Sequence, residues 1–262
     1  NNDGTIDLNV LKKTFTSETI LCIVMHANNE IGIINPINEI NNICKKNNVF
    51  LFVDATQSVG KIPVDIELMD IDLMSFSSHK LYGPQGIGCL YIKNGIKNRV
   101  LKGQIVGGGQ ESNYRSGTLN VLGIIGFGKA AEIANMKLPT EQLKILKLRN
   151  KIYNTFVENF DNFKLNGSID NRLPGNLNFS LKGIDNTWIM TQLFNKVSIS
   201  NGSACNSSAM ELSHVLKAIN SDDEISKSSL RLCVGRFNTE QEIDYFINLI
   251  FDLVNKYKKI KD

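Results

Sequence analysis

Short apolar runs of strand length alternate with helical patterns along the first half of the chain. Between the first two runs, residues 36–46 have a helical pattern, with Asn35 as the predicted N-cap and Pro36 at the first helical position. Near-continuous apolar strands separated by helices predict an α/β fold whose sheet is covered on both faces. The predicted strands are residues 20–25, 49–53, 71–76 and 87–92.

The second half of the chain has longer helical patterns and fewer strand-like runs. Pro139 interrupts the helical pattern and predicts a domain boundary there. We expect residues 1–138 to form a large domain with a sheet flanked by helices, and residues 139–262 to form a smaller α+β domain. In this half, helices are predicted over 119–134, 141–159 and 239–257, and strands over 176–181 and 197–199.

Polar residues gather where three of the predicted strands end. His26-Ala27-Asn28-Asn29-Glu30 follows the first strand, Asp54-Ala55-Thr56-Gln57 the second, and Ser77-Ser78-His79-Lys80 the third. In open α/β sheets, ligands bind beyond the carboxyl ends of the strands. The sequence therefore predicts one functional site at this edge of the sheet.

Lys80 is the candidate for covalent chemistry. A lysine at a strand end, beside two hydroxyls and an imidazole, is expected to be partly desolvated. Desolvation lowers the proton affinity of an amine, so the amine can attack an aldehyde cofactor. The alternative is a solvated surface lysine, since most lysines are exposed.

The other polar residues at these strand ends suit a phosphorylated, nitrogen-containing cofactor. Asp54 follows a buried run, where a carboxylate is costly unless it meets a cation such as a protonated pyridine nitrogen. Gln57 could donate to a ring hydroxyl, and Ser77 and His79 could bind phosphate oxygens from the same side of an extended segment. The alternatives are a turn-capping Asp54, a surface Gln57 and a hydrogen-bonded core His79.

The five cysteines are odd in number and widely spaced, which argues against a disulfide framework or a structural zinc site and favours a reducing compartment. Cys22, Cys89 and Cys233 lie in apolar runs and are predicted to be small core residues. Cys205 lies in a loop of small polar residues, where a thiol is accessible for nucleophilic attack or is merely incidental.

Arg231 is a further candidate for binding a charged ligand. Arg231 interrupts an apolar strand-like run, so its guanidinium is expected to bind a carboxylate or phosphate, or to form a structural ion pair. A net charge of +3 is too weak to argue for nucleic acid, and no apolar run approaches the length of a membrane span. No set of residues has the spacing of a metal site.

Taken together, these segments resemble the cysteine desulfurases, pyridoxal-phosphate enzymes of the class V aminotransferase family. Each segment alone is a weak signal, but seven occur in the family's order and spacing. The matching segments are His26 to Gly32, Val53 to Gly60, Ser77 to Pro84, Gly107 to Glu111, Arg115 to Thr118, Gly202 to Cys205, and Leu230 to Phe237.

The resemblance implies a fold-type I pyridoxal-phosphate-dependent transferase. By this resemblance Lys80 carries the cofactor covalently. Asp54 would pair with the pyridine nitrogen and Gln57 with the ring oxygen, while Ser77 and His79 would hold the phosphate.

The resemblance also implies a substrate, a product and partners. Asn28, which also lines the cofactor, and Arg231 would hold the carboxylate of L-cysteine. Cys205, on a mobile loop, would accept the sulfur as a persulfide and pass it to an acceptor or scaffold protein, as in iron–sulfur cluster assembly. Thr118 would reach the phosphate bound by a neighbouring subunit, which implies a homodimer.

Family members carry roughly a hundred further residues before the point where this chain starts, including a phosphate-binding loop and a histidine that stacks on the cofactor ring. We therefore expect an N-terminally truncated chain that retains cofactor weakly by itself. The cytoplasm is the expected compartment, or a mitochondrion or plastid if a targeting segment precedes residue 1. The alternatives are a selenocysteine lyase or another class V lyase, and a truncated, non-catalytic partner of an intact desulfurase.

Overall fold

The computed structural model describes residues 1–94, 96, 101–201, 213–219 and 222–261. It divides into two compact units. The four-strand unit comprises residues 7–27 and 36–138, and the three-strand unit comprises residues 1–6, 28–35 and 139–262. This division differs from a single cut at residue 139, because two early segments group with the second half of the chain.

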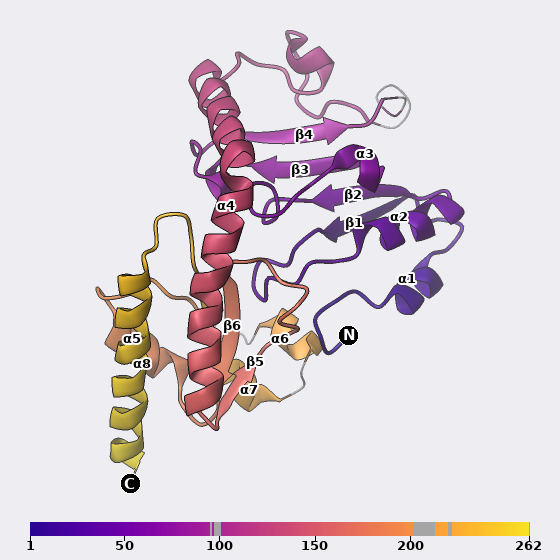
Figure 1. The fold of residues 1–262 in the computed structure, drawn as a ribbon. Helices are drawn as coiled ribbons and strands as arrows, with labels where there is room; N and C mark the ends of the chain where they lie inside the picture. The colour runs from indigo at the N-terminus through magenta and orange to yellow at the C-terminus, as the bar shows by residue number, and fades with distance from the viewer. Residues whose placement is uncertain (95, 97–100, 202–212, 220–221, 262) are drawn as a thin grey trace. The chain divides into compact units, whose positions relative to one another are not determined.

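The four-strand unit contains the four strands that the sequence predicts, with ends displaced by up to two residues. They run in the order β1-β2-β3-β4 (Figure 1). The first three are parallel, and β4 runs antiparallel to β3. The α/β class is confirmed, and the strands are β1 (Leu21–Met25), β2 (Phe50–Asp54), β3 (Leu73–Ser77) and β4 (Gly88–Ile92).

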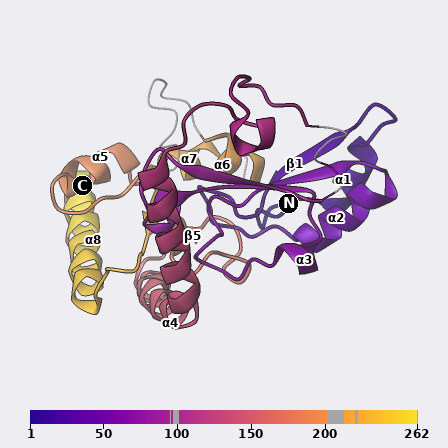
Figure 2. The ribbon, with the colours of Figure 1, turned by 90° about the horizontal axis from the view of Figure 1, so that it is seen from above.

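Helices α2 (Ile37–Lys46) and α3 (Ile66–Met69) lie on one face of this sheet (Figure 2). The remaining short helices of this unit are α1 (Leu8–Thr14), η1 (Ser78–Leu81) and η2 (Gln110–Asn113). The predicted cap of α2 is wrong by one position: Pro36 is the N-cap, and the side chain of Asn35 accepts a hydrogen bond from Ile6 N at 3.1 Å instead.

The sheet is flanked by helices, as predicted, but the described residues do not cover every strand on both faces. Burial along β1 alternates, and Ile23 is 64% exposed. Cys89 on β4 and Cys233 on β7 are also exposed, contrary to their prediction as core residues, whereas Cys22 is buried. The apolar runs predicted the strands, but which face of each strand is covered depends on the tertiary structure.

Asp70 ends α3 and accepts hydrogen bonds from the ammonium groups of Lys45 and Lys93. These bonds, that of Lys45 first, lower the pKa of Asp70 from 3.8 to about 2. Because the folded state then holds fewer protons than the unfolded state, the stabilisation is present above pH ~4 and lost as the pH falls towards ~2. The three side chains are well exposed, so solvent screening keeps the effect small.

We expect Asp70→Asn to lower the free energy of unfolding at pH 7 by at most about 1 kcal/mol. The difference from the wild-type protein should vanish as the pH falls from ~4 to ~2. Urea unfolding at several pH values measures it, and Glu18→Gln, an exposed carboxylate in a turn, is the control. A difference that persists at the lowest pH would mean that Asp70 acts through something other than its charge.

A single helix, α4 (Val121–Asn159), replaces the two helices predicted on either side of Pro139. Proline removes one backbone donor, but good helix formers flank it on both sides. Packing also holds both halves of the helix. Ala130 and Ala134 pack in the four-strand unit, whereas Ile152 and Phe156 pack in the core of the three-strand unit.

The three-strand unit has an antiparallel sheet with the order β5-β6-β7. Its core is rich in aromatic residues, and Phe156 and Phe179 pack edge to face with ring centroids 5.5 Å apart. The predicted strand at 197–199 is absent, and only an isolated bridge joins Ser200 to Arg231. The elements are β5 (Phe163–Leu165), β6 (Asn176–Leu181), α5 (Asn186–Leu193), α6 (His214–Ile219), α7 (Asp223–Lys227), β7 (Ser229–Cys233) and α8 (Glu240–Lys261).

Residues 28–35 pack in the three-strand unit through a small apolar cluster. Ile31 and Ile33 are fully buried against Leu216 of α6. Gly32 has a φ of +71°, and a Cβ at this position would lie 2.4 Å from the side chain of Asn176. The turn therefore requires glycine both for its backbone conformation and for this close approach. Among the described helices, none is both long and apolar enough to span a membrane.

Candidate active site

The carboxyl ends of β1, β2 and β3 lie at one edge of the four-strand unit. Met25 pairs with Asp54, and Asp54 pairs with Ser75. Beyond the strands, His26 N donates to Asp54 O and Ala55 N donates to Ser75 O, both at 2.9 Å. The predicted convergence of polar segments at one edge of the sheet is confirmed for these residues.

Asp54 and Gln57 are both half-buried at the end of β2. One carboxylate oxygen of Asp54 accepts a hydrogen bond from Thr56 N at 2.9 Å, which fixes the carboxylate at the strand end. The side-chain oxygen of Gln57 accepts from Lys61 Nζ at 3.1 Å. Within the described residues, Asp54 forms no ion pair, so its second oxygen remains available to a cation.

Lys80 lies on η1, directly after β3, and not in an extended segment. The expectation that Ser77 and His79 share one side of a strand is therefore wrong: Ser77 is half-buried, and His79 and Lys80 are exposed. The predicted desolvation of Lys80 is also absent from this chain. Within the described part of the chain, the side chains of these three residues form no hydrogen bond or ion pair.

Buried neighbours hold the Lys80 turn in place. Ser78 and Leu81, on either side of His79 and Lys80, are 0% and 2% exposed. Tyr82 follows with a φ of +66°, and Gly83 N closes the turn by donating to Ser78 O at 3.0 Å. Leu81 packs on α4 in a cluster that includes Phe127. The exposed ammonium group of Lys80 therefore projects from a fixed backbone.

We expect Gly83→Ala to destabilise this turn. A Cβ there would lie 2.2 Å from Ser78 Oγ and 2.9 Å from Ala130 Cβ, so the turn or α4 must shift, at a cost of about 1–3 kcal/mol. Chemical unfolding measures the loss, and Ser78→Ala in the same chain should recover part of it. Gly128→Ala is the matched control: it lies on α4 with open space around it and should gain up to about 1 kcal/mol. Equal effects at both glycines would contradict the close packing.

The three-strand unit holds the two residues predicted to bind a substrate carboxylate. Asn28 is half-buried, and its side-chain oxygen accepts hydrogen bonds from Glu30 N and Ile31 N at 2.8 and 3.0 Å. Arg231 lies on β7, half-buried, and its Nη1 donates to Asn29 O at 3.1 Å. Among the described residues Arg231 has no carboxylate partner, so the alternative of a structural ion pair has no support there.

Thr118 and Cys205 are the two remaining predicted site residues. Thr118 is exposed, in the segment that leads into α4. Cys205 lies outside the described residues, and so does its predicted mobile loop. No group of three or more His, Cys, Asp or Glu residues in the described ranges could hold a metal ion.

The chain matches the family described as aminotransferase class-V over residues 1–246. It belongs to this family. A relative named cysteine desulfurase IscS, from Ruthia magnifica subsp. Calyptogena magnifica, is 43% identical over 258 residues, which are 98% of this chain and 63% of the relative. The chain thus spans less than two thirds of that relative's length.

Solved structures agree with the family. One, titled NifS-like protein, has a TM-score of 0.87 and 34% identity, and the match covers 97% of this chain and 66% of that one. Another, titled SspA in complex with cysteine, has a TM-score of 0.76 and 31% identity, and the match covers 91% of this chain and 65% of that one.

Class V aminotransferases depend on pyridoxal phosphate, and the side chains of the four-strand unit suit this cofactor. They comprise an amine for the aldehyde, a carboxylate for the ring nitrogen, and a hydroxyl and an imidazole for phosphate oxygens. Of these side chains, those of Ser77, His79 and Lys80 have no partner among the described residues. These side chains therefore fit such a cofactor.

Glu30 is a buried residue of this region to which the sequence assigned no role. It is 4% exposed, and its carboxylate accepts a hydrogen bond from Ser213 Oγ at 2.6 Å. Its backbone oxygen also accepts from the side-chain amides of Asn176 and Asn178. The sequence signal that could have indicated Glu30 was a carboxylate five residues after the apolar run at 20–25. Glu30 fixes the loop that carries Asn28 and Asn29.

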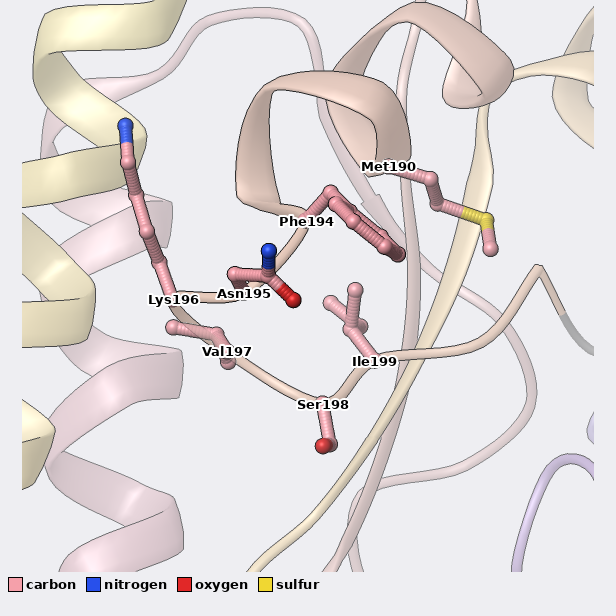
Figure 3. Close-up of a pocket in the computed structure, with 7 residues that line it drawn as sticks. All are labelled: Met190, Phe194, Asn195, Lys196, Val197, Ser198 and Ile199. Atoms are coloured by element: carbon pink, nitrogen blue, oxygen red, sulfur yellow. The ribbon is translucent and has the colours of Figure 1, made fainter.

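A surface hollow of the three-strand unit is lined by seven residues, none of which is a predicted site residue (Figure 3). It is formed by the end of α5 and the segment that follows it, including the exposed Phe194. No side chain that lines it carries catalytic chemistry beyond a single lysine, Lys196. This hollow is therefore a weaker candidate for the active site than the polar residues at the carboxyl ends of β1, β2 and β3.

Proposed function

We propose that this polypeptide acts as a pyridoxal-phosphate-dependent cysteine desulfurase. The reaction breaks the carbon–sulfur bond of L-cysteine and leaves L-alanine, with the sulfur bound as a persulfide on Cys205. The main observation in its support is that Asp54 and Ser77 lie at the carboxyl ends of two neighbouring parallel strands and that Lys80 follows directly after the second of these strands. The names of the relatives support the choice of L-cysteine as substrate.

When bound, pyridoxal phosphate supplies an electron sink for charge that develops on the substrate carbon. Asp54 would hold a proton on the ring nitrogen by its negative charge. Ser77 and His79 would hold the phosphate, and Gln57 would donate to the ring oxygen. The amine of Lys80 would bind the aldehyde and then carry protons to and from the substrate.

The three-strand unit would orient the substrate and receive the sulfur. Arg231 would bind the carboxylate of L-cysteine through its guanidinium, and the side-chain nitrogen of Asn28 would add a hydrogen bond. The Cys205 thiolate would attack the substrate sulfur as the carbon–sulfur bond breaks, and the substrate carbon would take up a proton to give alanine. A sulfur-acceptor or scaffold protein would then receive the persulfide.

We also propose that the enzyme is a homodimer in which Thr118 reaches the phosphate bound by the other subunit. Exposed apolar side chains precede and follow this residue in the sequence, and exposed apolar surface is typical of interfaces. They are Ile105, Val106, Leu119, Val121, Leu122, Ile124 and Ile125. The four described cysteines are free thiols, which supports a reducing compartment such as the cytoplasm.

The test is to supply the protein with pyridoxal phosphate and L-cysteine and to quantify alanine and protein-bound persulfide by mass spectrometry. A desulfurase forms both, with the persulfide on Cys205. Alanine without any persulfide would identify a lyase instead. A form of this protein as long as its relatives should bind the cofactor. If that form binds no cofactor at a saturating concentration, the proposal is contradicted.

A further inference from the structure

The sheet of the three-strand unit buries polar side chains on one of its faces. In β6, Asn176, Asn178 and Ser180 alternate with apolar core residues, and none of the three is more than 5% exposed. Arg231 on β7 is the register partner of Asn178, so its side chain leaves the sheet on this same face. A buried polar side chain is costly unless it is hydrogen-bonded, so the partners of these residues indicate what the face holds.

The side-chain amide of Asn178 is fixed through both its oxygen and its nitrogen. Its Oδ1 accepts hydrogen bonds from Asn166 Nδ2 at 2.8 Å and from Ser229 Oγ at 3.0 Å. Its Nδ2 points the other way and donates to Glu30 O at 3.1 Å. Asn176 Nδ2 donates to the same oxygen at 3.2 Å. The sheet thus holds the peptide group that follows Glu30 through two amide donors.

This peptide group belongs to a short backbone segment that both predicted carboxylate-binding residues contact. Glu30 N and Ile31 N donate to Asn28 Oδ1 at 2.8 and 3.0 Å. Asn29 O, in the preceding peptide group, accepts a hydrogen bond from Arg231 Nη1 at 3.1 Å. Asn28 and Arg231 are therefore linked through two consecutive peptide groups, and the second of these is held from the sheet.

We propose that Asn178 is a positioning residue for the carboxylate of the substrate. It holds the two peptide groups, and these fix Arg231 and Asn28 relative to each other. The remaining donors of the guanidinium are then already oriented when the carboxylate binds, which reduces the cost of binding. Because Asn178 is fully buried, it acts through this backbone and does not touch the substrate. The inference rests on the proposed function, in which Asn28 and Arg231 bind L-cysteine.

The test compares variants of a form of the protein as long as its relatives, loaded with pyridoxal phosphate. Asn178→Ala should raise KM for L-cysteine about 10-fold, the loss expected when one hydrogen bond to a charged group no longer forms. The change in kcat should stay below about twofold, because the carboxylate is bound equally in the ground state and the transition state. The dissociation constant of L-alanine, which carries the same carboxylate, should rise by the same factor in a titration followed by cofactor absorbance.

Ser180→Ala is the matched control. Ser180 is equally buried on the same face of β6, but its hydroxyl accepts from Asn166 Nδ2 and donates to Ile225 O. This variant should lower the midpoint of urea unfolding and leave KM within about twofold of the wild-type value. Asn176→Ala removes the other hydrogen bond to Glu30 O and should also raise KM, so it tests the same contact if Asn178→Ala does not fold. Equal changes in KM in Asn178→Ala and Ser180→Ala would overturn the proposal.

Combining Asn178→Ala with Arg231→Ala tests whether one residue acts through the other. If it does, the two changes together raise the L-alanine dissociation constant by less than the product of their separate effects. In a wild-type protein that forms alanine, effects that multiply fully, or an unchanged KM in Asn178→Ala, would overturn this inference alone. A wild-type protein that forms no alanine would overturn the proposed function, and this inference with it.

Discussion

Replacing Lys80 with alanine should abolish covalent attachment of pyridoxal phosphate and lower the rate of alanine formation from L-cysteine by roughly 10²–10⁴-fold or more. Lys80 supplies both the amine that binds the aldehyde and the group that carries protons. Borohydride reduction followed by mass spectrometry measures the attachment, because it makes the bond permanent and locates it on a peptide. The turn itself should survive, since Lys80 is exposed and Ser78 and Leu81 anchor the backbone.

Two further variants separate the chemistry of Lys80 from its charge. Lys80→Arg keeps a cation at the same position but has no amine that can bind the aldehyde, so it should be as inactive as the alanine variant. Lys129→Ala removes an exposed lysine from α4 and should leave attachment and rate unchanged. If cofactor remains covalently bound to Lys80→Ala, another lysine carries it and the assignment of Lys80 is wrong.

Replacing Cys205 with serine should remove the protein-bound persulfide and stop multiple turnovers that transfer sulfur. A serine hydroxyl is far less nucleophilic than a thiolate, so it cannot take the sulfur from the substrate. Cofactor attachment to Lys80 should be unaffected, because that step involves only the amine. Differential alkylation and mass spectrometry of each cysteine-containing peptide give the persulfide position directly.

The chain offers matched controls for this thiol. Cys89 and Cys233 are exposed in the structure, so both are accessible to sulfur and to alkylating reagents. Cys89→Ser and Cys233→Ser should nevertheless keep persulfide formation at Cys205. A persulfide that moves to Cys233 would transfer the role of acceptor to β7, and undiminished alanine formation in Cys205→Ser would favour a lyase.

The sequence predicted part of the candidate site at the carboxyl ends of β1, β2 and β3. Asp54 and Ser77 were found from the residue types that follow apolar runs, and the pairing of β1, β2 and β3 brings those strand ends to one edge. The sequence left the exposure of Lys80 open as an alternative and could not decide it. The exposure depends on a turn closed by the hydrogen bond from Gly83 N to Ser78 O and on Leu81 packing against α4.

The roles of Lys80 and Cys205 are predictions that the variants above test, and those of Asp54, Gln57, Ser77, His79, Asn28, Thr118 and Arg231 also remain predictions. The structure adds one restriction for Asn28. Its side-chain oxygen is already engaged by Glu30 N and Ile31 N, so only its nitrogen can serve a substrate. The sequence could not predict this restriction, because it does not show whether the turn uses the oxygen or the nitrogen of the Asn28 side chain.

By itself, the sequence determined the α/β class, the four strands of the first sheet and the family, because apolar runs and motif order are properties of the chain alone. Only the tertiary structure decided that α4 continues through Pro139, that Cys89 and Cys233 are exposed, and that residues 28–35 belong with the second half of the chain. The physical reason is the same in each case. Burial and helix continuity depend on contacts between segments distant in sequence, and local patterns do not contain those contacts.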